Sequence, residues 1–423
     1  MSSRGAQGAW DSGFVASIEE IKAVLPRQAA YMGRVWIFAS PEAGKCGESG
    51  ITIMSEDIFE TVLKSLGLKR FDVPGPKPGG FVHLFQIVTE QARTRLAGIS
   101  DDYADADAFA FGFAEHRAFN AFAHRTSKDI ICLYTTPLRV LWSFFNAMMD
   151  NRQIFPWVDD VDVLGGTAPP PKGDLFFLRE TPPHDDAGEA FNPIRPRLAR
   201  ALFDVAADFL LMHELGHLRN GHVALLQQRA GMRPFRELPY EEADKLEIPE
   251  MQVLEFDADG FAIQKVFERV YKENPFAEFS KGLLKDHRLP EDGPYTASWY
   301  FTWFAVYSVF RLFDEAMEIS EIPLRMQPPA ALRQACLLPA VAAMTSRSGW
   351  SNLSLQQWVD LATDAGLEAE RTLTGLRRMK PNPHAYLAAW NGAAFEQIER
   401  YLETWEGLAP QLAALRSGAT PAE

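Results

Sequence analysis

Two histidines and a glutamate in the middle of the chain have the residue types and spacing of a metal hydrolase site. His213 and His217 lie four residues apart, and Glu214 directly follows the first of them. On a helix, positions i and i+4 share one face and lie about 5–6 Å apart, so both imidazoles can reach a single metal ion. Glu214 then projects towards the side of the metal on which water binds. This arrangement is typical of a zinc hydrolase in which the glutamate is the general base.

The segment that carries this motif, residues 198–218, is apolar around almost its whole circumference, which predicts a buried helix. Burying two imidazoles and a carboxylate among leucine and phenylalanine side chains without partners costs several kcal/mol. A bound metal ion removes this cost. We therefore favour a metal site over histidines that only make hydrogen bonds within a core.

A second acidic motif supplies the ligand that zinc would still lack. Residues 251–271 are predicted to form another helix, on which Glu255 and Asp259 share a face. On their own, these carboxylates would be interpreted as a solvated helix face. Because zinc needs a third protein ligand, we assign Glu255 to the metal. Asp259 is then placed to accept the outer N–H of a ligating histidine, which fixes the orientation and tautomer of that ring.

His222 is a competing candidate for the third ligand. The metzincin pattern H-E-x-x-H-x-x-G-x-x-H would need glycine at position 220 and histidine at position 223, where the chain has Asn220 and Val223. We therefore exclude that class and interpret Asn220 and Gly221 as the end of the helix. His222 can still face the cleft as a catalytic residue that contacts the substrate or the oxyanion.

Composition and charge exclude several classes of partner. The chain has 423 residues, of which 47% are hydrophobic, enough for a sizeable core. Its formal net charge of −14 argues against nucleic acid and anionic membrane surfaces as main partners. Three widely spaced cysteines indicate a reducing compartment rather than a disulfide framework. Since no secretory signal and no apolar run of transmembrane length is visible, we expect a soluble cytoplasmic protein without a membrane span.

Four segments together resemble one group of peptidases. The chain is similar to the gluzincin peptidases related to the CAAX prenyl endopeptidase and the HtpX membrane protease, and to the soluble Lit-type phage-exclusion peptidases. The family's H-E-x-x-H matches residues 213–217, and its E-x-E-A-D matches residues 255–259 with Asp257 in place of the middle glutamate. Its N-A-F edge strand resembles residues 120–123, and its later H-P-P-x-x-x-R resembles residues 327–333. The resemblance covers roughly residues 115–340.

The resemblance implies a role for each matching residue. It implies that His213, His217 and Glu255 bind zinc, that Glu214 activates water and that Asp259 orients a ligand. An edge strand near Asn120 would bind an extended peptide substrate by β-augmentation.

The chain departs from the family's pattern in two respects. Gln327 stands where the family has histidine, so catalytic help from that position is not expected. The membrane spans of the prenyl protease branch are missing, so we do not expect a prenylated or membrane substrate.

The periodicity and the resemblance together predict an α+β protein that is predominantly helical, with a small β-sheet and the H-E-x-x-H motif on an active-site helix. We expect an N-terminal α/β segment at residues 1–80 and a zincin-like metallopeptidase core at residues 81–345. A C-terminal helical segment at residues 346–423 follows. The proline-rich insertion at residues 150–197 is either a lid over the cleft or a plain surface insertion.

Within this frame, the sequence predicts individual elements from hydrophobic periodicity and turn residues. The expected helices are residues 18–25, a helix that begins near residue 55, and residues 81–96, 136–149, 299–304, 351–367 and 382–415. The expected strands are residues 35–38, 51–54, 119–123 and 129–133.

We therefore expect a zinc endopeptidase that hydrolyses a protein or peptide substrate, with Zn²⁺ as its cofactor. Glu214 would take a proton from water and pass it to the leaving amine. His222, Tyr295 and Arg333 are the candidate donors for the oxyanion, and Arg333 is also a candidate for substrate binding. The oligomeric state stays open.

Three other functions are compatible with these residues. One is a protease that cleaves a single target protein. Another is a zinc-bound regulatory or sensor protein without general proteolytic activity. A structural zinc protein is disfavoured, because structural sites usually have four protein ligands.

Overall fold

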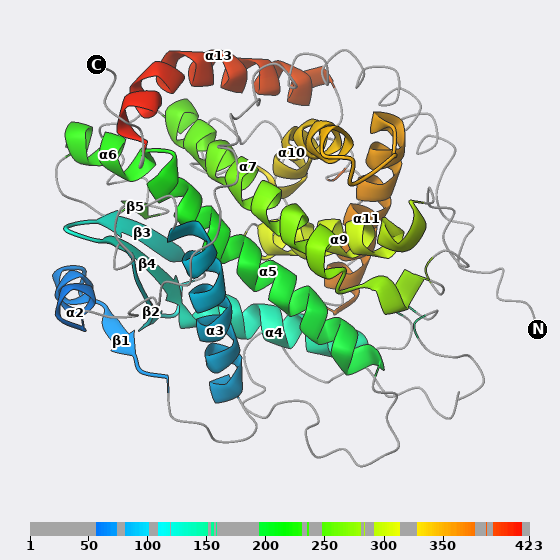
Figure 1. Cartoon of the computed structure of the whole chain (residues 1–423), viewed down its shortest axis with the longest axis horizontal. Helices are drawn as coiled ribbons and strands as arrows, with labels where there is room; N and C mark the ends of the chain where they lie inside the picture. The colour runs from blue at the N-terminus through cyan, green and yellow to red at the C-terminus, as the bar shows by residue number, and fades with distance from the viewer. Residues whose placement is uncertain are drawn as a thin grey trace, which may run out of the picture.

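A small mixed β-sheet packs against a predominantly helical body in this protein (Figure 1). The computed structural model describes residues 56–73, 81–100, 109–118, 120–150, 154, 155, 158, 194–230, 235–236, 248–280, 283, 292–313, 328–376, 386 and 392–416. Their arrangement confirms the expected predominantly helical α+β class. The elements expected at residues 18–25, 35–38 and 51–54, Gln327 and nearly all of the insertion at 150–197 lie outside the described residues.

The five described strands form one sheet in the order β1-β2-β4-β3-β5. They are β1 (Lys69–Phe71), β2 (Phe109–Glu115), β3 (Ala121–Arg125), β4 (Asp129–Tyr134) and β5 (Phe235–Arg236). β2 and β4 are parallel, and the other neighbouring pairs are antiparallel. β3 and β4 confirm the two strands expected at residues 119–133. β1, β2 and β5 were not expected. β1 and β5 are too short to give a periodic signal. β2 is buried on both faces, so its residues do not alternate between apolar and polar.

β3 is the second strand from the end of the described sheet and not its edge, which corrects the expectation for the strand that follows Asn120. β5 pairs with the outer side of β3 through Phe122 with Arg236 and Ala123 with Phe235. β5 comes from the connection between the two helices that carry the metal motifs. At these two positions an incoming peptide strand would have to displace the chain's own backbone.

The helices confirm most of the elements that periodicity predicted. They are α2 (Glu56–Ser65), α3 (Phe81–Ser100), α4 (Thr135–Asp150), α5 (Ile194–Arg219), α6 (His222–Ala230), α7 (Ile248–Glu273), α9 (Thr296–Phe313), α10 (Ala330–Arg347), α11 (Leu355–Leu376) and α13 (Gly392–Leu415). The short 3-10 helices η4 (Ala277–Phe279) and η5 (Gly293–Tyr295) precede α9. None of the described helices combines the length and the apolar character that crossing a bilayer requires.

Helix α5 forms the centre of the molecule. It contacts β3 and β4 on one side and α4, α7 and α9 on the others, so its side chains are buried around most of the helix (Figure 1). Arg125 at the end of β3 donates a 3.0 Å hydrogen bond to the carbonyl of Leu218, near the end of α5. The nearly apolar circumference noted in the sequence therefore reflects contact on most sides of the helix.

The described elements before residue 81 and after residue 345 pack against the segment between them. β1 pairs with β2, and α2 packs on both strands. α11 packs on α9, and α13 lies across α6 and α7 (Figure 1).

A glycine allows α5 and α7 to approach closely. A Cβ atom at Gly216 would lie 3.1 Å from the Cα and from the carbonyl oxygen of Ala258 in α7. Five residues later, Gly221 has a φ of +85°, a conformation that ends α5 and turns the chain into α6. This turn confirms the helix end expected at residues 220–221.

Replacing Gly216 by valine should lower the free energy of unfolding by at least about 2 kcal/mol, because a β-branched side chain does not fit between the two helices. Denaturant unfolding followed by circular dichroism measures this change. Gly98→Val is the matched control: Gly98 is an exposed helical glycine with no atom within 4 Å of a built Cβ. This control should change the stability by less than about 0.5 kcal/mol. Equal unfolding midpoints for the two variants would contradict the close contact.

Candidate metal centre

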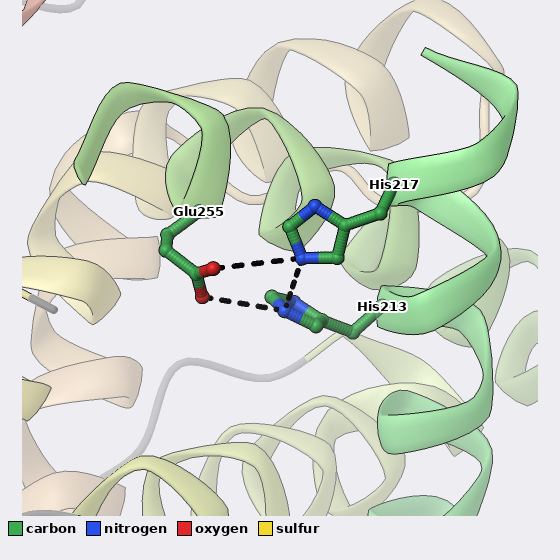
Figure 2. A group of neighbouring side chains, drawn as sticks. All are labelled: His213, His217 and Glu255. Atoms are coloured by element: carbon green, nitrogen blue, oxygen red, sulfur yellow. Dashed lines mark hydrogen bonds and ion pairs between the residues drawn. The ribbon is translucent and has the colours of Figure 1, made fainter. Parts of the chain in front are cut away.

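Helices α5 and α7 bring His213, His217 and Glu255 together at one point (Figure 2). The Nε2 atoms of the two histidines are 3.0 Å apart. Oε2 of Glu255 lies 3.4 Å from Nε2 of His213, and Oε1 lies 3.6 Å from Nε2 of His217. These are the three residues that the sequence named as metal ligands.

The separations of these atoms fit a tetrahedral metal ion. Bonds of about 2.0–2.1 Å at tetrahedral angles place neighbouring ligand atoms roughly 3.3 Å apart. The observed separations of 3.0, 3.4 and 3.6 Å lie on both sides of that value. Oε2 of Glu255 is buried without a hydrogen-bond donor among the described residues, as expected of an oxygen whose partner is an ion. Two histidines and one glutamate are also a known donor set of catalytic zinc sites.

The surroundings of the two histidines give them opposite pKa shifts. Burial lowers the pKa of His213, but the adjacent carboxylates of Asp259 and Glu255 outweigh burial and raise this pKa to about 10. The pKa of His217 lies well below its ordinary value because the ring is buried beside the charge on His213. His213 thus holds a proton that a metal ion must displace when it binds.

Asp259 and Arg333 hold His213 from behind. Oδ1 of Asp259 lies 2.9 Å from Nδ1 of His213, the ring nitrogen that faces away from Glu255. Arg333 in α10 donates two hydrogen bonds of 2.7 Å to the Asp259 carboxylate. Its guanidinium also lies 4.2 Å from the centre of the Phe310 ring. Asp259 therefore occupies the position expected from its spacing.

The environment of Arg333 differs from the expectation for a substrate-binding or oxyanion residue. The side chain is 4% exposed, and its Nη2 lies 4.0 Å from Oε2 of Glu255, behind the ligands. A carboxylate as buried as Asp259 needs a compensating cation, and Arg333 supplies it.

His222 lies behind His217. The Nδ1 atoms of the two rings are 2.9 Å apart, and Nε2 of His222 lies 3.0 Å from Oδ2 of Asp257. His222 is 0% exposed and both of its ring nitrogens are engaged, so it does not face a cleft as the sequence suggested. The physical reason is the turn at Gly221, after which His222 lies against His217 of α5 and Asp257 of α7.

Glu214 is buried beside the ligands and contributes none of the three ligand atoms. Its Oε2 has no hydrogen-bond partner among the described residues. Burial raises the pKa of Glu214 to about 8; the charge of Glu255 adds to this shift and His213 opposes it. A cation at the ligand cluster would lower that pKa towards neutrality, where a carboxylate can both accept and return a proton.

The structure does not bring the remaining sequence candidates to the ligands. Oδ1 of Asn120 accepts a 2.6 Å hydrogen bond from the backbone N–H of Ala121, at the start of β3. Tyr295 stacks between Tyr271 and Trp299, with ring centres 4.9 and 5.6 Å away. In these contacts both residues support local structure.

Two residues next to the site were missed in the sequence. Asp257 drew notice only as a departure from the family's motif, because it is not on the i and i+4 face that Glu255 and Asp259 share. Trp405 in α13 donates a 3.4 Å hydrogen bond from Nε1 to Oδ1 of Asp257. No local pattern connects Trp405 to residues so far away along the chain.

Comparison of the chain with protein-family models, with curated proteins and with solved structures finds no match. The functional assignment therefore depends on the geometry of this site.

Replacing any one of His213, His217 and Glu255 by alanine should remove zinc from the purified protein. Loss of a direct ligand should weaken binding by more than the roughly 100-fold that loss of a supporting hydrogen bond costs. Elemental analysis after dialysis and competition with a chromophoric chelator measure the effect. Glu214→Gln is the control and should keep its zinc, because Glu214 provides none of the three ligand atoms. Full zinc content in Glu255→Ala would contradict the ligand set.

Proposed function

We propose that this protein is a zinc-dependent endopeptidase with a zincin-like core, which hydrolyses peptide bonds of a protein or peptide substrate. One observation carries the proposal: His213, His217 and Glu255 converge from two helices, with Glu214 buried beside them. The ligand set alone supports a metal site. The additional carboxylate, which has an unpartnered oxygen, supports hydrolysis.

In this proposal each residue has a separate task. Zinc, when bound, acts as a Lewis acid towards the scissile carbonyl and lowers the pKa of water towards about 7. Glu214 takes the proton from the attacking water and returns it to the leaving amine. Asp259, held by Arg333, keeps Nε2 of His213 directed at the ligand cluster.

A zinc-bound regulatory or sensor protein is the alternative, and the burial of the site favours it. The side chains of His213, His217 and Glu255 are 5%, 1% and 2% exposed, and Glu214 is 6% exposed. β5 also occupies part of the outer side of β3, where the family resemblance would place a peptide. A purely structural zinc site is disfavoured, because the candidate ligand group formed by the described residues has three members rather than four.

The zinc-loaded protein should cleave unfolded polypeptides such as reduced casein, and Glu214→Gln should lower kcat by about 10²–10⁴-fold, the usual contribution of a general base. Mass spectrometry of the products gives the cleavage sites and the rate. A chelator should abolish the activity and added zinc should restore it.

Zinc content must be measured in the same samples. Equal zinc in wild type and Glu214→Gln with cleavage only by wild type would support the peptidase. Stoichiometric zinc without cleavage of any unfolded substrate would contradict a general endopeptidase and favour the sensor. Equal cleavage by Glu214→Gln would remove Glu214 from its role as base.

A further inference from the structure

The Nδ1 atoms of His213 and His217, which point away from the ligand cluster, have different hydrogen-bond partners. Nδ1 of His213 faces a carboxylate, Asp259, whose charge is balanced by Arg333. Nδ1 of His217 faces a second imidazole, His222, which in turn faces the carboxylate of Asp257. The support of His217 is therefore a chain of two hydrogen bonds, which we call the His222–Asp257 relay.

The relay has one arrangement of protons that suits a metal site. His217 must offer the lone pair of Nε2 to a metal, so its proton lies on Nδ1. Nδ1 of His222, 2.9 Å away, must then accept that proton in a hydrogen bond, which leaves the His222 proton on Nε2. Nε2 of His222 is 3.0 Å from Oδ2 of Asp257, and a carboxylate can only accept there. Asp257 thus fixes the tautomer of His222, and His222 fixes the tautomer of His217.

The charge environment of Asp257 differs from that of two other buried aspartates on the same two helices. Asp208 is paired with Arg95 and Arg269 at 3.3 and 2.7 Å, and Asp259 is paired with Arg333 at 2.7 Å. Among the described residues, the side-chain partners of Asp257 are His222 and the Trp405 indole, and neither is a permanent cation. A purely structural buried carboxylate would be expected to have a partner such as arginine. The negative charge of Asp257 is directed at the imidazole instead.

We propose that His222 and Asp257 are positioning residues that hold His217 in the Nδ1–H tautomer and so determine how tightly and how long the centre retains its metal ion. This inference rests on the metal centre of the proposed function and does not depend on peptidase activity. A hydrogen-bond partner of this kind usually contributes about 10–100-fold to metal affinity. Both residues are 0% exposed, so the relay is closed to competing water.

The test compares zinc affinity and zinc release among three variants of the full chain. His222→Leu removes both hydrogen bonds and should raise the dissociation constant for zinc by about 10–100-fold, mainly through faster release to a chelator. His222→Asn keeps an amide oxygen that can accept from Nδ1 of His217, so it should lose less affinity. Asp257→Asn should lie between wild type and His222→Leu, because an amide can present either a donor or an acceptor to His222.

Asp208→Asn is the matched control for a lost buried charge. Asp208 is 2% exposed and lies on α5, but its ion pairs do not involve a ligand. This variant should lower the melting temperature and leave the dissociation constant for zinc unchanged. A purely structural role of the relay would give His222→Leu the same behaviour as Asp208→Asn, and that result would overturn the proposal.

NMR can determine the tautomers of His217 and His222 directly, in protein without bound metal. Two-bond ¹H–¹⁵N spectra of histidine-labelled protein should show the proton of His217 on Nδ1 and that of His222 on Nε2. Each of the nine histidines can be assigned from a single-site variant. The opposite tautomer at either ring would overturn the relay, and these spectra decide the matter even if His222→Leu does not fold. Wild-type protein that binds no zinc, with the expected tautomers, would overturn the proposed metal centre while leaving the orientation of His217 by His222 established.

Discussion

At Gly216, α5 meets the backbone of α7 so closely that a Cβ atom would lie only 3.1 Å from the Cα and the carbonyl oxygen of Ala258. His217 follows this glycine, and Asp259 follows its partner Ala258, so the contact fixes the register between the two motifs. Ligand atoms on two separate helices converge only if those helices hold one distance and one register. The packing of small residues provides this constraint before any metal binds.

The site concentrates ionisable groups that would be costly to bury singly. Arg333 balances Asp259, and the ring of His213 lies between the carboxylates of Asp259 and Glu255, which raise its pKa. Burial raises the pKa of Glu214, whose Oε2 has no hydrogen-bond partner among the described residues. A divalent cation would replace the proton of His213 and balance the negative charges of Glu255 and Glu214. Burying these carboxylates without a compensating charge costs free energy, so the site favours a bound cation over apolar side chains in its place.

Sequence reasoning succeeded where the information is periodic and local. The spacing of His213 and His217, and of Glu255 and Asp259, depends only on the helical repeat, and the structure places all four side chains together. It failed where a single backbone conformation redirects a residue. The positive φ of Gly221 directs His222 towards His217 and Asp257, and a pattern of residue types contains no information on that direction.

Long-range contacts were also beyond the reach of the sequence. The sequence named Arg333 as a candidate for the substrate or the oxyanion. Its burial against Asp259 depends on how α10 packs on α7, so no local pattern could show it. The two-residue strand β5 gives no periodic signal at all, although it changes which strand forms the edge of the sheet. Most of the helices and the strands β3 and β4 could therefore be predicted, whereas β2 and the surroundings of the ligands could not.

The hydrogen bond from Trp405 to Asp257 has a consequence for the order of events during synthesis. The ligands belong to α5 and α7, whereas Trp405 belongs to α13, which leaves the ribosome much later. Domains begin to fold while the rest of the chain is still being made. All three ligand residues are therefore synthesised before α13, which completes the surroundings of Asp257. Under the proposal of a metal centre, an ion bound before α13 docks would lack the support that Trp405 gives to Asp257.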